Sequence, residues 1–175
     1  YFSCHCHSEF SNLRLIDSIN RIEDEMEYAY KLGLAGRVLT DHDSISGHYR
    51  ALKYYNAKVN HKMKNDPNPW DRPFRFALGN EIYLTREGLT EQDFVKDVDF
   101  FYHLILIAKD EIGHRQIREL SAMAWKRGYF RGILHVFNYP SDLSKVITGG
   151  HVICSTACLG GYTARQVLAE NYERA

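Results

Sequence analysis

The segment FFYHLILIA, at residues 100–108, limits more than any other how this chain can fold. It is a nearly continuous apolar run of strand length, interrupted by one histidine, His103. Such a run is typical of a β-strand that is buried on both faces, as in a parallel sheet. Similar patterns predict four further strands, at residues 1–7, at 36–40, at 74–84 with Gly79 as the site of a bulge, and at 151–156, where the strand is again expected to be buried.

Helices are predicted between these strands. Apolar residues recur at helical spacing through residues 22–32, and Gly33 is suited to end that helix. A second helix is expected to have Ser46 as its cap and to run to about Val59. Two more are predicted at residues 111–127 and after the glycine pair at 160–161. This alternation of strands and helices predicts an α/β fold with a largely parallel sheet or barrel.

Length and composition narrow the class of protein. The 175 residues are enough for one domain with a hydrophobic core. Lysine plus arginine and aspartate plus glutamate number 22 each, so there is no overall basic field that would attract nucleic acid, and only a local basic groove remains open. The sequence has no apolar run of membrane-spanning length and no signal peptide, so we expect no membrane partner. The four cysteines do not resemble a secreted disulfide framework, which favours a cytoplasmic location.

Polar side chains fall at equivalent places along the predicted strands. His5 and His7 end the first strand, and His42 follows the second. Glu81 lies in the third, His103 in the fourth, and Cys158 follows the fifth. Because the carboxyl ends of parallel strands meet at one edge of a sheet, we expect these groups to lie close together. A single histidine is most often an ordinary surface or core residue, but five strands that each supply a ligand indicate a metal centre.

The types of side chain narrow the ion. Imidazole and thiolate suit zinc, manganese or iron, and a carboxylate can bridge two such ions. Magnesium alone would favour ligation by oxygen. The set therefore predicts a centre that holds more than one divalent transition-metal ion, and centres of this kind hydrolyse phosphate esters.

Five motifs, in order along the chain, resemble the signature blocks of the PHP domain family (polymerase and histidinol phosphatase). They are CHCHSEFS, TDHDSISG, LGNEIYL, YHLILIAKD and CSTACLGG. The stretch HLILIAKDEIGHRQIRELSAMAW together with STACLGG is most similar to one branch, the N-terminal PHP domain of the bacterial C-family polymerase, DNA polymerase III alpha subunit. The resemblance covers nearly the whole chain. It implies a distorted (βα)7 barrel, which would be truncated at the C-terminus here.

The resemblance also implies a set of metal ligands. The family holds up to three ions on nine positions, and seven of these match residues of this chain: His5, His7, Asp17, His42, Glu81, His103 and Cys158. Asp17 lies in RLIDS, where about three extra residues separate it from the first histidine pair. The last two ligands, in an Asp-x-His block, are expected after residue 175. His5, His7, His42, Glu81 and His103 are the expected catalytic residues, acting through a water that the metal activates. We expect Asp41 to orient His42 rather than to bind an ion itself.

The function implied is a metal-dependent 3′→5′ exonuclease that proofreads within a DNA polymerase. Its partners would be DNA, at the primer 3′ end, and other replisome subunits. The chain starts at Tyr1 inside a predicted strand, so we read it as a partial PHP domain, with polymerase domains expected downstream. Two alternatives stay open. One is a stand-alone phosphatase acting on a small phosphomonoester such as histidinol phosphate, and the other is a non-catalytic structural module of the polymerase.

Several residues of suggestive type match no family block. We interpret Cys4, Cys6 and Cys154 as small core residues. The region after the fourth strand is basic and is interpreted as a solvated helix face, with a minor contact to DNA as the alternative. The remaining histidines are treated as ordinary: His48, His61, His114, His135 and His151.

Overall fold

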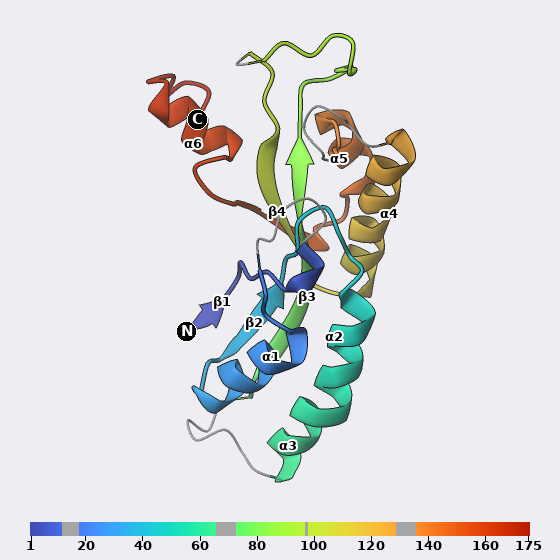
Figure 1. The fold of residues 1–175 in the computed structure, drawn as a ribbon, viewed down its shortest axis with the longest axis vertical. Coiled ribbons are helices and arrows are strands. Elements are labelled where there is room, and N and C mark those ends of the chain that lie inside the picture. Colours follow the sequence, from blue (N-terminus) through green and yellow to red (C-terminus); the bar gives the residue numbers. More distant parts are fainter. Residues whose placement is uncertain (12–17, 66–72, 97, 129–135) are drawn as a thin grey trace.

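The fold is built on one five-stranded sheet with helices packed against it (Figure 1). The computed structural model describes residues 1–11, 18–65, 73–96, 98–128 and 136–175. The predicted α/β class is confirmed, and the sheet is curled as part of a barrel would be. The strands lie in chain order across the sheet: β1 (Phe2–Ser3), β2 (Gly36–Leu39), β3 (Arg75–Leu84), β4 (Tyr102–Ala108) and β5 (Val152–Thr156).

The sheet is only partly parallel. β1, β2 and β3 run parallel to one another, whereas β4 is antiparallel to both β3 and β5. The prediction of a largely parallel sheet is therefore wrong for β4. The reason lies in the connection over residues 85–101, whose described residues contain no helix. Without a crossover helix, a chain that leaves β3 returns beside it in the opposite direction.

β3 changes its pairing partner partway along its length. It pairs with β2 up to Leu78 and with β4 from Gly79 onward. The register from Gly79 to Leu84 is regular, so the predicted bulge is absent there. Gly79 is needed for a different reason, because a Cβ at this position would lie 2.5 Å from the carbonyl oxygen of Leu106. The glycine allows the two backbones to approach closely.

The first group of helices packs against the parallel half of the sheet. α1 (Ile22–Lys31) forms as predicted, and Gly33 follows it with a φ of +70°. α2 (His48–Tyr54) continues through a π-helical turn, η2 (Tyr55–Val59), into α3 (Asn60–Asn65), and Figure 1 shows them as one rod. Ser46 is not the cap, because Gly47 takes that position. The core here consists of Ile22, Met26, Ala29, Tyr30, Leu39, Ala51, Val59, Phe74 and Leu78.

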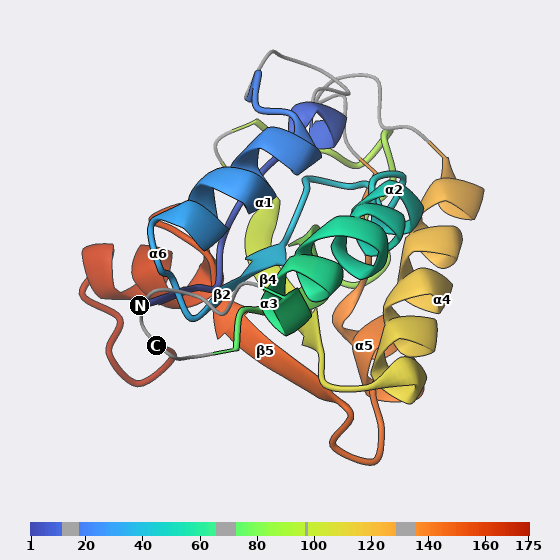
Figure 2. The ribbon, with the colours of Figure 1, turned by 90° about the horizontal axis from the view of Figure 1, so that it is seen from below.

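The second group packs against the antiparallel half. α4 (Glu111–Arg127) has the predicted bounds, and the side chain of Asp110 caps it by accepting from the N–H of Gly113 at 2.9 Å. α5 (Pro140–Val146) was not predicted, although a proline at its first position is a usual start signal. α4 and α5 lie side by side in both ribbon views (Figure 2). The core here consists of Ile82, Leu106, Ile117, Leu120 and Val146.

The last strand departs from the prediction. β5 was expected to be buried, but four of its five residues are exposed. In the described part of the chain β5 is the end strand and pairs with β4 alone. Cys154, on this strand, and Cys4 are both exposed, so their interpretation as core residues is wrong. α6 (Tyr162–Leu168) follows β5.

Among the described residues, no helix combines the length and the apolar character that crossing a bilayer requires.

His48 is a buried histidine on α2 that contacts both β3 and α4. Its side chain comes from α2, and its Nε2 lies 2.8 Å from the carbonyl oxygen of Gly79. Its Nδ1 lies 3.1 Å from Nε2 of His114 on α4. Burial, together with the nearby charges of His114 and Arg118, lowers the pKa of His48 to about 4, although the hydrogen bond to Gly79 opposes this shift.

We predict that this histidine makes the stability of the fold depend on pH. An unfolded histidine titrates near 6.5, so between pH 6.5 and 4 the unfolded state binds a proton that folded His48 does not. The free energy of unfolding should therefore fall as the pH drops through this window, by up to about 3 kcal/mol from this group. Urea unfolding at pH 7 and pH 4.5 measures the change.

The matched comparison is between His48→Gln and His61→Gln, because His61 is exposed on α3. His48→Gln should flatten the loss of stability between the two pH values, and His61→Gln should leave it as in the wild type. Equal pH dependence in the two variants would contradict the prediction.

Candidate metal centre

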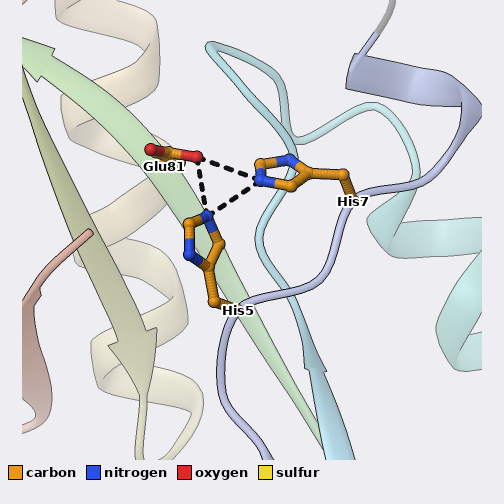
Figure 3. A group of neighbouring side chains, drawn as sticks. All are labelled: His5, His7 and Glu81. Carbon is orange, nitrogen blue, oxygen red and sulfur yellow. Dashed lines mark hydrogen bonds and ion pairs between the residues drawn. The ribbon is translucent and has the colours of Figure 1, made fainter. Parts of the chain in front are cut away.

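Two histidines from the start of the chain meet a glutamate from the middle of β3 (Figure 3). Nε2 of His5 lies 2.9 Å from Oε2 of Glu81, and Nε2 of His7 lies 3.1 Å from the same oxygen. The two Nε2 atoms are 2.8 Å apart. Both imidazoles are partly exposed, whereas the Glu81 side chain is 1% exposed. The two rings therefore cover the solvent side of a buried carboxylate.

Two more histidines contact the same carboxylate. Nδ1 of His42 lies 3.2 Å from Oε2 of Glu81. Nδ1 of His103 lies 2.8 Å from the other oxygen, Oε1. Each oxygen of Glu81 therefore faces at least one imidazole nitrogen, and the carboxylate lies between four rings.

The donor atoms form two overlapping groups, each close enough to hold one ion. The first is His5, His7 and Glu81, and the second is His42, Glu81 and His103; in each, the ligand atoms lie within 4.8 Å of one another. Glu81 belongs to both groups. Its Oε2 faces the first group and His42, and its Oε1 faces His103, so the carboxylate can offer an oxygen to each group, as a carboxylate that bridges two metals does. Nitrogen-rich ligation of this kind fits zinc, manganese or iron.

Strand pairing explains why the second group converges. An isolated bridge places His42, just after β2, beside Glu81 on β3. Because β4 is antiparallel, it begins where β3 ends, and His103 pairs with Tyr83. We expected ligands at the carboxyl ends of parallel strands, and for His103 that reasoning is wrong. It lies near the start of its strand, and the reversed direction brings it to the same end of the sheet.

The first histidine pair does not lie in a strand. β1 ends at Ser3, so the predicted strand over residues 1–7 is too long. The segment that carries His5 and His7 is fixed to the end of β2 by Thr40. The backbone N–H of Thr40 donates to the carbonyl of Cys6 at 2.8 Å, and its hydroxyl accepts from the N–H of Cys6 at 2.9 Å.

The two remaining predicted ligands have different outcomes. Sγ of Cys158 lies 3.4 Å from Nδ1 of His103 and accepts the N–H of Gly160 at 3.3 Å. The structure thus brings Cys158 to the edge of the cluster. Asp17 lies outside the described residues, so its place remains a prediction.

Asp41 reaches the cluster through serines. Its buried carboxylate accepts the N–H of Ser8 at 2.6 Å, the hydroxyl of Ser8 at 2.9 Å and the hydroxyl of Ser11 at 2.9 Å. Its link to His42 runs through Ser11, whose Oγ also accepts the backbone N–H of His42 at 3.1 Å. We expected Asp41 to orient His42 directly, and the intervening serine was not foreseen.

Tyr83 is another residue that the sequence analysis missed. Its hydroxyl lies 3.0 Å from Nδ1 of His42. The signal was present, because residues two apart on a strand face the same side and Tyr83 follows Glu81 by two.

The imidazoles keep Glu81 ionised despite its burial. Burial alone would raise the pKa of this carboxyl, but hydrogen bonds from His103, His5 and His7, with the charge of His42, hold it well below its usual range. For Asp41 the balance is the opposite, because burial raises its pKa more than the hydrogen bonds from Ser8 and Ser11 lower it. Glu81 is therefore the anionic centre of the cluster.

Four of the other histidines have contacts of their own elsewhere. His48 contacts His114, as described above, and Nδ1 of His151 lies 2.7 Å from Oδ2 of Asp110. His61 lies on α3 beside Asn65. His135 is outside the described residues.

A cavity of about 950 Å³ opens beside the histidine pair. His5 and His7 line one part of it, and Arg21 lines another together with Asp24 and Tyr28 of α1. This volume lies in the range of ligand-binding clefts. The first imidazole pair is therefore reachable from solvent.

Comparison with known proteins identifies relatives among DNA polymerases. The chain is 35% identical over 162 residues to a DNA-directed DNA polymerase of Bacillus phage SPbeta, covering 90% of this chain and 12% of that protein. It is 30% identical over 178 residues to DNA polymerase III subunit alpha of Borreliella burgdorferi, covering 100% of this chain and 13% of that protein. The same subunit of Aquifex aeolicus is 30% identical over 166 residues, covering 90% and 12%. The chain thus spans only about an eighth of the length of these relatives.

One solved structure, of a candidate metal-dependent phosphoesterase from Bifidobacterium adolescentis, matches with a TM-score of 0.40 and 22% identity, over 72% of this chain and 35% of that one.

The sequence profile of the PHP domain matches residues 3–175, nearly the full length of the chain. All five motifs described above fall inside this range. The chain belongs to the PHP domain family.

Proposed function

We propose that this PHP domain is a metal-dependent phosphodiesterase that removes nucleotides from the 3′ end of a DNA primer. The observation that carries the proposal is the buried Glu81 carboxylate, contacted on both oxygens by four imidazoles. A structural histidine cluster has no need of a buried anion at its centre, whereas a site for two cations does.

The ligands we assign are those of the sequence analysis: His5, His7, Asp17, His42, Glu81, His103 and Cys158. The mixture of imidazole, carboxylate and thiolate favours zinc, manganese or iron over magnesium. Ions bound there would acidify a water molecule to give a nucleophile and would stabilise the charge that develops on the attacking and leaving oxygens.

The protein's own groups hold this site rigid. Glu81 supplies a fixed negative charge from β3, which pairs with β2 before Gly79 and with β4 from Gly79 onward. Ser11 contacts Nδ1 of His7, which is not the nitrogen that faces Glu81. Tyr83 contacts Nδ1 of His42, which is also the nitrogen that faces Glu81. The cavity beside His5 and His7 leaves space for a substrate on the solvent side.

The DNA substrate is inferred from the relatives. Those with the similarity described above are DNA polymerases, and this chain matches about an eighth of each. We infer that the domain works within such a polymerase in the cytoplasm, with DNA and other replisome subunits as its partners.

We predict two or three transition-metal ions per chain in the purified full-length protein that carries this domain, measured by elemental analysis. In a His5→Ala/His7→Ala variant the content should fall by at least one ion, because the first ligand group loses two of its three members. His61→Ala, which changes an exposed histidine of α3, is the control and should keep the full content. A metal-free wild-type protein would overturn the proposal and favour a non-catalytic module.

We predict that the same protein shortens a 5′-labelled primer from its 3′ end when supplied with manganese or zinc. Glu81→Gln removes the central charge and should slow this reaction at least about 100-fold, since even residues that only support metal ligands alter activity by 10–100-fold. As a control, the assay is repeated with the catalytic carboxylates of the polymerase domain mutated. This excludes the possibility that nucleotides are removed by reversal of DNA synthesis. Hydrolysis of a small phosphomonoester without primer shortening would contradict a DNA substrate and favour the phosphatase alternative.

A further inference from the structure

Ser11 is the meeting point of three hydrogen bonds beneath the histidine cluster. It ends a short 3-10 helix, η1 (Glu9–Ser11), directly after the first histidine pair, and it is 2% exposed. Its Oγ lies 2.9 Å from Oδ1 of Asp41, 3.0 Å from Nδ1 of His7 and 3.1 Å from the backbone nitrogen of His42. A serine hydroxyl has one proton to donate and two lone pairs that accept. All of its capacity is therefore in use.

The direction of two of these bonds is fixed by chemistry. The backbone N–H of His42 can only donate, so it occupies one lone pair of Ser11. An ionised carboxylate can only accept, and Oδ1 of Asp41 already accepts the backbone N–H of Ser8 at 2.6 Å. The proton of the Ser11 hydroxyl must therefore point to Asp41.

The third bond follows by elimination. With its proton committed to Asp41, Ser11 has one lone pair left for His7, so Nδ1 of His7 must carry the proton of that bond. A histidine that binds a metal ion must be neutral, so it gives up the Nε2 proton that it otherwise donates to Glu81, and a proton on Nδ1 then leaves the lone pair on Nε2. That atom is the one that faces Nε2 of His5 and Oε2 of Glu81.

We propose that Ser11 is a positioning residue that fixes His7 in the Nδ1–H tautomer and so presents the Nε2 lone pair to the ion. This inference rests on the proposed function, because it assigns His7 as a metal ligand. Asp41 acts through Ser11 by accepting its proton. The charge of a buried carboxylate thus reaches the ring of His7 through one hydroxyl, the Oγ of Ser11.

The test compares the full-length wild-type protein with Ser11→Ala and with Ser44→Ala. Ser44 is an equally buried serine, 3% exposed, whose hydroxyl accepts the backbone N–H of Ser46 in the turn after His42. Zinc affinity is measured by competition with a chelator. The tautomer of His7 is read by ¹⁵N NMR of the zinc-loaded proteins, with the signal assigned by its loss in His7→Gln. Thermal unfolding shows whether each variant is folded.

The expected result is a proton on Nδ1 of His7 in the zinc-loaded wild type. Ser11→Ala should weaken zinc binding about 10- to 100-fold and give a mixture of His7 states, as is usual when the partner of a ligating histidine is lost. Ser44→Ala should keep the wild-type affinity and tautomer.

Two results would overturn the inference while the proposed function stands. One is zinc-loaded wild type with the proton on Nε2 of His7, which decides the matter even if Ser11→Ala fails to fold. The other is folded Ser11→Ala that equals Ser44→Ala in affinity and tautomer. A wild-type protein that takes up no zinc, manganese or iron would instead overturn the proposed function, and the inference with it.

Discussion

The structure depends on one buried charge. Glu81 is almost completely removed from solvent, and an isolated carboxylate in such a place would cost several kcal/mol. Four imidazoles and the surrounding strands offset this cost, which explains why segments as distant in sequence as residues 5 and 103 meet at this point. The carboxylate in turn limits what the rings can do. They must direct nitrogens inward, where these nitrogens are placed to act as ligands to a cation.

Most of the histidine rings in the cluster are also held by neighbouring polar side chains. Three of the four rings have a second polar partner besides Glu81: Ser11 for His7, Tyr83 for His42, and Cys158 for His103. Rings held in this way lose little freedom when an ion binds, which strengthens binding without any further ligand. The serine partner is also short and buried, so its position is set by the backbone of η1 rather than by a flexible side chain.

The sequence predicted those parts of the structure that depend on local patterns. The bounds of α4 follow from its apolar spacing, and the convergence of His5, His42, Glu81 and His103 was expected from their places next to strands. What could not be read locally was the direction of β4, which depends on whether residues 85–101 form a crossover helix. The exposure of β5 was missed because an apolar sequence does not reveal whether a neighbouring strand covers it. Ser11 and Tyr83 were missed because a hydroxyl gains its role only from the tertiary contact.

The change of partner along β3 has a consequence for how the domain opens. The residues before Gly79 share one apolar core with α1 and α2, and those after it share another with α4 and α5. The domain therefore has two units, one around each core, which share β3 and also contact each other through His48 and through the cluster of Val38, Ile105 and Ile107. Units with separate cores can open separately in native-state hydrogen exchange. His5, His7 and His42 belong to the first unit, whereas His103 and Cys158 belong to the second. Two metal ions bridged by Glu81 would cross-link the two units. Metal binding would then turn two separate opening events into one.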